Sequence, residues 1–385
     1  MIYLDNNATT QPTARVVESM LPYLTECYFN ASASTAGLTG ADKPRREATA
    51  ALAKLLNAEE PECFAFTSGA TESNNWVFFS LARGSRFGRA LISSVEHASV
   101  AEPAAELVRI GIEVVEVPVD PQGIVRLDAL SEALTEDTGL VSIIAANNET
   151  GVIEPIAKIG RLIRERCPTA LFHTDATQAI GKIAVDLQGD WSDVDLLSFS
   201  AHKFCGPKGI GGVYMRPGFS LKPMLLGGGQ EHGLRSGTTN TPALAGLAVA
   251  AQLAITTDFG AIRELRDRFE LALREVCPSV VVHSAETLRL PNTSCFSIPS
   301  VFASDVVEAL AYRHIVVGNG PACSAGAMHP PKTLLAMGVP YDLATAALRV
   351  SLAPSTTWCE LNTFIKALAD VLAVSMRERN ALTSI

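Results

Sequence analysis

The stretch from Ser198 to Lys203, which reads Ser-Phe-Ser-Ala-His-Lys, is the part of the sequence that most strongly indicates the fold. It follows an aspartate-rich segment, residues 193–197, that predicts the start of a buried strand, and it leads into a glycine-containing loop at residues 204–209. A lysine at the end of such a strand can hold an aldehyde cofactor as a Schiff base, and pyridoxal phosphate (PLP) is the cofactor that needs one. Taken alone, Lys203 is equally consistent with a surface lysine in a loop.

Over about the first 250 residues, short apolar runs alternate with amphipathic runs. This alternation predicts an α/β fold, in which a mostly parallel sheet is covered by helices on both faces. Ligands bind beyond the carboxyl ends of the strands in such sheets, which is where the polar motifs fall. From about residue 255, a long charged helix at 262–276 and shorter strands predict a second, smaller α/β domain. The strands we expect are 63–66, 90–93, 114–117, 140–145, 171–173, 280–282 and 294–297.

Length and composition exclude several classes of protein. The chain has 385 residues, enough for two domains, and its net charge of −9 gives no reason to expect direct nucleic-acid binding. The amino terminus lacks the features of a signal peptide, and no apolar run approaches the roughly 20 residues of a membrane span, so we expect no membrane association. The eight cysteines include no C-x-x-C pair, which predicts no metal site and favours a reducing cytoplasm.

Four polar segments follow predicted strands, and each has a functional and an ordinary interpretation. Residues 67–72 could cradle a phosphate with the free N–H groups of a helix start, or could form an ordinary helix cap. Asp175 could keep a pyridinium nitrogen protonated, or could cap a helix. His97 could stack on a flat cofactor and exchange protons, or could be an unremarkable loop histidine. Residues 147–151 form either a binding loop or a plain turn.

Three further features lie nearer the carboxyl terminus. The glycine-rich loop at residues 227–238 could bind a phosphate or could be a flexible connector. Arg349 is a lone charge in an apolar run, so its guanidinium would suit either a substrate carboxylate or a structural ion pair. Cys323 lies between glycines in what we expect to be a mobile loop, which favours a nucleophile. Cys205, beside the lysine, is the main alternative, although the glycine–proline turn after it favours a supporting role.

Taken in order, these motifs resemble the cysteine desulfurases, which are PLP enzymes of aminotransferase class V and fold type I. The resemblance begins at residues 3–10, Tyr-Leu-Asp-Asn-Asn-Ala-Thr-Thr, and ends at residues 348–352, so it covers nearly the whole chain. About seven motifs in one collinear order are far more specific than any single one. The resemblance implies a large PLP-binding domain at 13–257 with a mostly parallel seven-stranded sheet. It also implies a small α/β domain, 1–12 and 258–385, that carries the catalytic-cysteine loop.

The resemblance also implies a role for each site residue. Lys203 would be the Schiff-base lysine and the acid–base group, and Cys323 would take the sulfur. His97 would be both a catalytic and a stacking residue. The expected cofactor contacts are Lys203, Asp175, Gln178, His97, Ala70, Thr71, Ser200 and His202, together with Thr238 from the second subunit of a homodimer. The expected contacts with the substrate carboxylate are Asn148, Arg349 and Asn30.

The implied reaction converts L-cysteine to L-alanine. Lys203 would remove the α-proton, the thiolate of Cys323 would attack the substrate sulfur, and the resulting persulfide would pass to an acceptor protein. That acceptor would be an iron–sulfur scaffold or a tRNA- or DNA-sulfur-modification protein. The chain departs from the family at Pro321 in the cysteine loop and at Ala353-Pro354, where a glycine is usual. It also ends soon after a helix expected near 369–375, whereas relatives that dock an iron–sulfur scaffold carry a longer tail.

Two other classes of function compete with this interpretation. One is a PLP enzyme without persulfide chemistry, such as an aminotransferase or a selenocysteine lyase, and Cys323 in a flexible loop argues against a plain transaminase. The other is a non-catalytic binding subunit. The presence of Lys203, Asp175 and His97 in one chain argues against that alternative.

Overall fold

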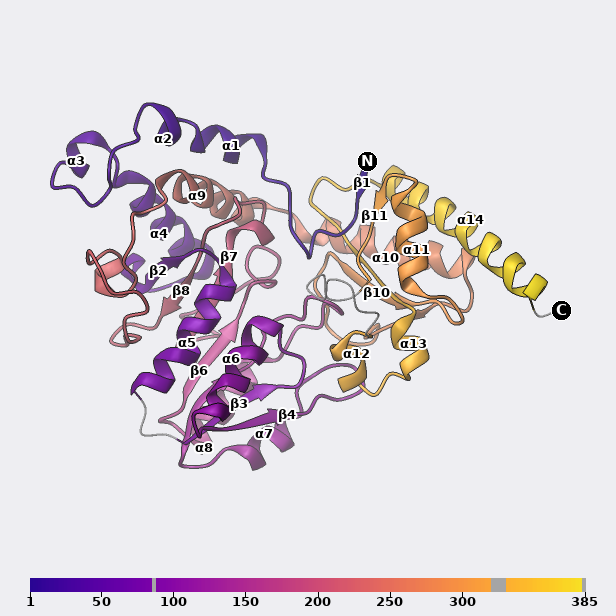
Figure 1. Ribbon diagram of the computed structural model, residues 1–385, viewed down its shortest axis with the longest axis horizontal. Helices are drawn as coiled ribbons and strands as arrows, with labels where there is room; N and C mark the ends of the chain where they lie inside the picture. Colours follow the sequence, from indigo (N-terminus) through magenta and orange to yellow (C-terminus); the bar gives the residue numbers. More distant parts are fainter. Residues whose placement is uncertain (85–87, 320–329, 383–385) are drawn as a thin grey trace.

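The computed structural model describes residues 1–84, 88–319 and 330–382, without the side chains of 374–382. The chain forms a large unit built on a seven-stranded sheet. A smaller unit of short strands and helices lies beside it (Figure 1). In the large sheet, β8 runs antiparallel to both of its neighbours, and every other adjacent pair is parallel. The mostly parallel seven-stranded α/β fold is therefore confirmed. The strand order is β2 (Phe64–Thr67), β8 (Gly211–Met215), β7 (Leu196–Ser200), β6 (Leu171–Asp175), β5 (Thr138–Ser142), β3 (Arg89–Ser93) and β4 (Glu113–Val117).

Both faces of this sheet are buried, because successive residues of a strand contribute to different hydrophobic clusters. Leu91 and Phe199 belong to one cluster, and Ala90 and Leu196 belong to another. Side chains alternate between the two faces of a strand, so the two clusters lie on opposite sides of the sheet. The helices that bury one face are α5 (Ala70–Gly84) and α6 (Ala98–Arg109). Those that bury the other are α4 (Lys43–Leu56), α7 (Leu127–Ala133), α8 (Ile156–Arg166) and α9 (Thr241–Thr256).

The smaller unit has its own hydrophobic core, in which Phe269, Phe296 and Phe364 pack together. Its strands are β9 (Val281–Val282), β10 (Thr293–Ser297) and β12 (Ala347–Ser351), all antiparallel, and the parallel pair β1 (Ile2–Tyr3) and β11 (Ile315–Val316). Its main helices are α10 (Phe259–Val276), α11 (Ala303–Ala311) and α14 (Trp358–Leu382), with the short α12 (Lys332–Ala336) and α13 (Tyr341–Thr345). The domain limits at residues 13 and 258 stay a prediction.

Element boundaries differ from the sequence-based expectations by a few residues, for local reasons. The long helix begins at Phe259 rather than 262, because Asp258 caps it by accepting from the backbone N–H groups of Gly260 and Ala261. The strand expected to begin at Cys63 begins at Phe64, because residues 61–63 form a short 3₁₀ turn. None of the described helices is by itself long and apolar enough to span a bilayer, and α9 with α10 meets that test only as a pair bent by 73°.

The amino-terminal segment joins the two units. After β1 in the small unit, the backbone N–H of Asn6 donates to the carbonyl of Ser351 in β12 at 3.2 Å. Four residues later, the N–H of Thr10 donates to the carbonyl of His202 in the large unit at 2.9 Å. The chain then forms the short helices α1 (Ala14–Met20), α2 (Pro22–Thr25) and α3 (Ala36–Thr39), which run along the top of the large unit in Figure 1 and away from the small unit. The residues between these two contacts cover the carboxyl edge of the large sheet.

Candidate active site

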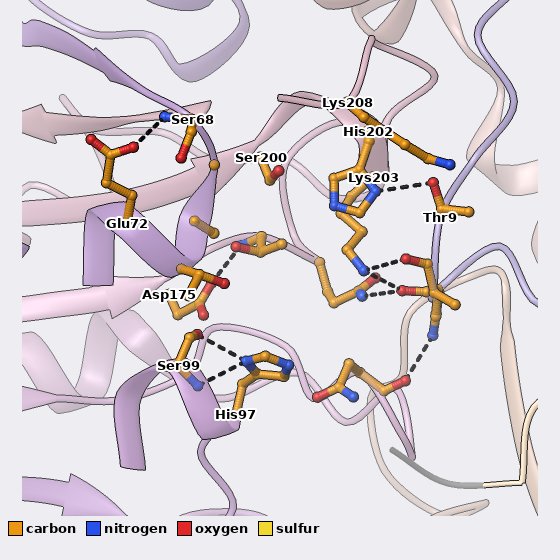
Figure 2. Close-up of a pocket in the computed structure, with 18 of the residues that line it drawn as sticks. Thr9, Ser68, Glu72, His97, Ser99, Asp175, Ser200, His202, Lys203 and Lys208 are labelled. Carbon is orange, nitrogen blue, oxygen red and sulfur yellow. Dashed lines mark hydrogen bonds between the residues drawn. The ribbon is translucent and has the colours of Figure 1, made fainter. Parts of the chain in front are cut away.

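A cavity of about 510 Å³ lies at the carboxyl ends of the parallel strands, and residues 7–9 of the amino-terminal segment form one of its walls (Figure 2). Ten of the predicted site residues line it: Ala70, Thr71, His97, Asn148, Asp175, Gln178, Ser200, His202, Lys203 and Arg349. Two other predicted site residues do not line the cavity. Asn30 is exposed after α2, and Thr238 is exposed at the rim of a neighbouring pocket. Cys323 lies outside the described residues. The fold thus brings together side chains from both units that span 280 positions of the sequence, from 70 to 349.

Lys203 lies in a 3₁₀ turn, Ala201–Lys203, that directly follows β7. The chain turns sharply here, and a side chain at Gly206 would bring its Cβ to 2.8 Å from the carbonyl oxygen of Ala201, so only glycine fits. The Nζ of Lys203 donates to the backbone carbonyls of Asn7 at 2.7 Å and Ala8 at 2.8 Å. Its amine is therefore held between the sheet and the amino-terminal segment, with the cavity beside it.

Asp175 is the last residue of β6 and is only 3% exposed. Its Oδ1 accepts from the backbone N–H of Thr177 at 2.9 Å, and its Oδ2 accepts from Nδ2 of Asn74 at 2.8 Å. Asn74 also donates to Oγ of Ser99 at 2.8 Å. These contacts fix the carboxylate and connect it to the residues around His97.

His97 caps the start of α6, and its ring orientation is fixed by Ser99. The backbone N–H of Ser99 donates to Nδ1 of His97 at 3.1 Å, and Oγ of Ser99 lies 2.8 Å from the same nitrogen. Because Nδ1 accepts, the proton of the neutral ring is on Nε2. Burial lowers the pKa of His97, while the charge of Asp175 opposes that effect. The ring is therefore neutral near pH 7, with an N–H on its free edge.

The start of α5 forms another wall of the cavity. The first N–H groups of a helix have no acceptor within the helix, which makes this a suitable place for an anion. Gly69 precedes the helix, and a Cβ there would lie 3.4 Å from Oγ of Ser200, so glycine leaves this corner open. Lys208, which sequence analysis missed, also lines the cavity. Burial, and then the charges of nearby lysines, lower the pKa of His202 to about 4, so its ring is neutral.

Arg349 lies in β12, is 2% exposed and lines the cavity. Its Nε and Nη2 donate to Oδ1 of Asp5 at 3.2 and 2.6 Å, and its Nη1 donates to the carbonyl of Asn148 at 2.9 Å. The structural ion pair considered from the sequence is therefore present. Asp5 binds the edge of the guanidinium formed by Nε and Nη2. Arg349 also lines the cavity, so it has a structural partner and is accessible to a ligand.

Sequence reasoning gave no role to several residues that hold these side chains. Asn7 and Asp5 belong to the amino-terminal motif, but nothing local shows that they contact Lys203 and Arg349. Asn74 and Ser99 lie on separate helices, and only the folded chain shows that they connect Asp175 to His97. Each of these contacts joins distant parts of the sequence, so no spacing rule could have found them.

The residues around the cavity fit PLP. An amine is available for its aldehyde, a carboxylate for its pyridine nitrogen and an imidazole for its ring face. A helix start with a hydroxyl, an imidazole and a lysine is available for its phosphate. In addition, Oγ1 of Thr177 is buried without a hydrogen-bond partner and borders the cavity. That hydroxyl indicates a polar ligand in this position.

Comparison with known proteins agrees with this site. The family model for class V aminotransferases matches residues 2–364. A cysteine desulfurase of Cereibacter sphaeroides is 38% identical over 373 residues, which cover 96% of this chain and 95% of that protein. A solved NifS-like protein has a TM-score of 0.90 at 36% identity, covering 97% of this chain and 99% of the other. A structure of SspA in complex with cysteine has a TM-score of 0.81 at 32% identity, covering 93% and 100%.

The chain therefore belongs to the class V aminotransferase family, whose members are PLP-dependent enzymes. Its close relatives at nearly full length place it within one branch of that family. The protein is a cysteine desulfurase. The predicted family, fold class and cofactor are confirmed, while the roles of individual residues are developed below as proposals.

Proposed function

We propose that this enzyme takes sulfur from L-cysteine with Lys203 as the cofactor lysine and acid–base group, and that Cys323 receives the sulfur before an acceptor protein does. The observation that supports the proposal best is the arrangement of Lys203, Asp175 and Arg349 around one cavity. An amine, a carboxylate for the cofactor ring and a guanidinium for the substrate carboxylate are the three groups that this chemistry requires.

When bound, PLP supplies an electron sink for the negative charge that develops at the substrate α-carbon. The protein has to position the substrate and move protons around that carbon. Arg349 and Asn148 hold the carboxylate at one end of the cavity, so the α-carbon lies toward Lys203. The amine of Lys203, in its uncharged form, removes the α-proton and returns a proton to the product. Asp175 keeps the pyridine nitrogen protonated.

His97 has two proposed tasks. Its ring packs on the face of the cofactor, and the N–H on its free edge exchanges a proton with the reacting groups. Because burial lowers the pKa of His97, its neutral form already predominates at the pH where a free histidine is half protonated. The chain of contacts through Ser99 and Asn74 to Asp175 keeps the ring from turning. The thiolate of Cys323 then attacks the substrate sulfur, and L-alanine leaves.

Replacing Arg349 with glutamine should raise KM for L-cysteine roughly 10- to 100-fold, as expected for the loss of a charge-assisted hydrogen bond. The kcat should change much less, because the carboxylate is bound in both ground and transition states. Steady-state kinetics with L-cysteine measure this. Arg126→Gln is the matched control, because Arg126 is an exposed residue that pairs with Asp128 away from the cavity. An R349Q enzyme that folds normally, as judged by circular dichroism, and keeps the wild-type KM would contradict the role.

We propose that the enzyme is a homodimer, because two exposed segments carry the predicted site residues that lie outside the cavity. Asn30 follows two short helices in a segment where Tyr28 is 72% and Leu38 is 91% exposed. Thr238 ends a loop in which Leu226 is 86% exposed. Contiguous exposed apolar side chains mark contact surfaces. A second copy of the chain that covers both segments would bring Thr238 to the phosphate end of the partner's cavity.

Ion pairs hold the loop that carries Thr238 in place on the large unit. Nε of Arg235 donates to Oε1 of Glu72 in α5 at 2.8 Å. At the other side of the loop, Nη2 of Arg45 in α4 donates to Oε2 of Glu231 at 3.2 Å. Because these ion pairs fix the loop on the large unit, little further ordering is needed when a partner binds.

Mixing two inactive variants tests whether Thr238 acts across the interface. In a hybrid of Lys203→Ala and Thr238→Val chains, the only cavity with Lys203 would receive its threonine from the other chain. We therefore expect hybrids to recover the PLP affinity and activity that T238V homodimers lack. Light scattering should give twice the chain mass. A monomer in solution, or a hybrid no better than T238V alone, would contradict the proposal.

We also propose a cytoplasmic location and a protein acceptor. All seven cysteines within the described residues are free, which supports a reducing compartment. The acceptor is an iron–sulfur scaffold or a tRNA- or DNA-sulfur-modification protein. Relatives with names such as IscS and DndA support sulfur transfer to different acceptors in this family.

A further inference from the structure

Asn7 is a buried amide in the amino-terminal segment, and every hydrogen-bonding position of its side chain is occupied. The residue is 1% exposed. Its Nδ2 donates to the carbonyl of Asn148 at 3.1 Å and to Oγ1 of Thr293 at 2.9 Å. Its Oδ1 accepts from Nδ2 of Asn292 at 3.1 Å and from Nζ of the buried Lys182 at 3.2 Å. A side-chain amide has two donor and two acceptor positions, so all four are used.

These contacts allow only one orientation of the amide. The carbonyl of Asn148 can only accept a hydrogen bond, and Nδ2 of Asn292 can only donate one. Oγ1 of Thr293 donates its own proton to Oδ1 of Asn292 at 3.1 Å, so it accepts from Asn7. Turning the amide round would place its oxygen against two acceptors and its NH₂ group against donors. The donor side of Asn7 therefore faces Asn148.

The carbonyl of Asn148 is where this amide meets the proposed binding site for the substrate carboxylate. The same oxygen accepts from Nη1 of Arg349 at 2.9 Å. The other edge of the guanidinium is bound by Asp5. Asn148 and Arg349 both line the active-site cavity. Asn7 thus donates to the very oxygen atom that orients the guanidinium of Arg349.

Asn148 and Arg349 come from different units, and Asn7 bridges the units at this point. Asn148 lies in a loop after β5 of the large unit, whereas Arg349 lies in β12 of the small unit, which pairs with β10. The NH₂ group of Asn7 donates to Asn148 on one side and to Thr293, the first residue of β10, on the other. The units also pack closely here, because a Cβ at Gly151 would lie 2.8 Å from Cβ of Thr293.

We propose that Asn7 is a positioning residue for substrate recognition, because its side-chain amide holds Asn148 and Arg349 at the spacing that binds a carboxylate. Charge-assisted hydrogen bonds depend on the placement of their donors, so a change in that spacing should weaken binding. The backbone carbonyl of Asn7 holds the amine of Lys203 at 2.7 Å, whichever side chain residue 7 carries. The inference rests on the proposed role of Arg349 and Asn148 at the carboxylate.

The test compares two ligands of the holoenzyme that differ only in the carboxylate. L-Alanine is the product, ethylamine is L-alanine without its carboxylate, and the absorption of the bound cofactor reports the binding of either without turnover. Asn7→Asp keeps an oxygen toward Lys182 and Asn292 but replaces the donor that faces Asn148 with an acceptor. It should weaken L-alanine binding about tenfold and leave ethylamine binding unchanged. The KM for L-cysteine should rise by a similar factor, with a much smaller change in kcat.

Further variants separate recognition from stability. Asn7→Ala removes the donor without burying a charge, and it should lose the preference for L-alanine even if the aspartate variant folds poorly. Asn6→Ala is the matched control, because Asn6 is 3% exposed and its amide donates to the backbone carbonyls of Tyr3 and Ser351 in the small unit. It should lower the melting temperature and keep the preference. In the R349Q background, N7D should weaken L-alanine binding by less than about threefold, because the two residues act through one contact.

The possible outcomes separate this inference from the assignment of Arg349. If R349Q loses the preference for L-alanine over ethylamine and both Asn7 variants keep it, the inference is wrong and the role of Arg349 stands. If R349Q keeps the preference as well, the assignment of Arg349 is wrong and the inference is overturned with it. A purely structural role for Asn7 would lower stability, or weaken both ligands equally, and would also contradict the inference.

Discussion

Replacing Lys203 with alanine is expected to lower alanine formation from L-cysteine by about 10³-fold or more. The loss is large because one side chain both holds the cofactor and moves the α-proton. The nearby amine of Lys182 is not free to take over, since it is held by Asn7 and Gln178. Release of L-alanine measures the reaction. Borohydride reduction of the variant should also leave no cofactor attached at residue 203.

Lys158→Ala is the matched control for this change, because the exposed lysine on α8 should be replaceable without effect. PLP should still enter the cavity of the Lys203 variant through Asp175 and the start of α5, although without a covalent bond. Alanine formation within about tenfold of the wild type would mean that another group removes the α-proton. The proposed mechanism would then be wrong at its first step.

Cys323→Ala is expected to abolish sulfur transfer to an acceptor while leaving PLP bound. The thiol of residue 323 is required only for the attack on the substrate sulfur, whereas the proposed cofactor contacts come from the cavity and from Thr238 of a second copy of the chain. The absorption of the bound cofactor should therefore match that of the wild type. Transfer of labelled sulfur from L-cysteine to a thiol acceptor measures the loss, which should be complete within detection.

Two other cysteines serve as comparisons for this prediction. Cys359→Ala should transfer sulfur normally, because Cys359 is exposed on α14 in the small unit. Cys205 is the alternative nucleophile, since it lies two residues after Lys203 and lines the second cavity. Burial raises its pKa, which disfavours the thiolate. If C323A kept full transfer and Cys205→Ala lost it, the sulfur-accepting residue would have to be reassigned.

The parts of the account that the sequence predicted are those with a local signature. Alternating apolar runs predicted the strands of the large sheet except β8, which was not expected from the sequence. Motifs that follow separate parallel strands meet because the carboxyl ends of those strands lie at one edge of the sheet. Asp175 and Lys203 follow adjacent strands, β6 and β7, so their proximity follows from the parallel order. The 10 residues around one cavity were identified from the polar motifs that follow strands, from the lone charge of Arg349 in an apolar run and from the resemblance to a known family.

What the sequence did not predict depends on contacts between distant segments. The ion pair between Asp5 and Arg349 joins residues 344 positions apart. Asn7 contacts both lysines because the amino-terminal segment crosses from the small unit to the large one, and no local pattern specifies that path. Lys182 carries no local sign of burial, and only the folded chain shows that it is buried and bound by Asn7 and Gln178.

The intact mass of the purified enzyme, recorded before and after L-cysteine is added without reductant, shows whether sulfur passes through Cys323. The account predicts the added mass of one sulfur atom per chain, with peptide mapping placing it on Cys323, together with release of L-alanine. If PLP is bound but no sulfur is added, or if the sulfur is found on Cys205, the proposed route of sulfur through Cys323 is contradicted.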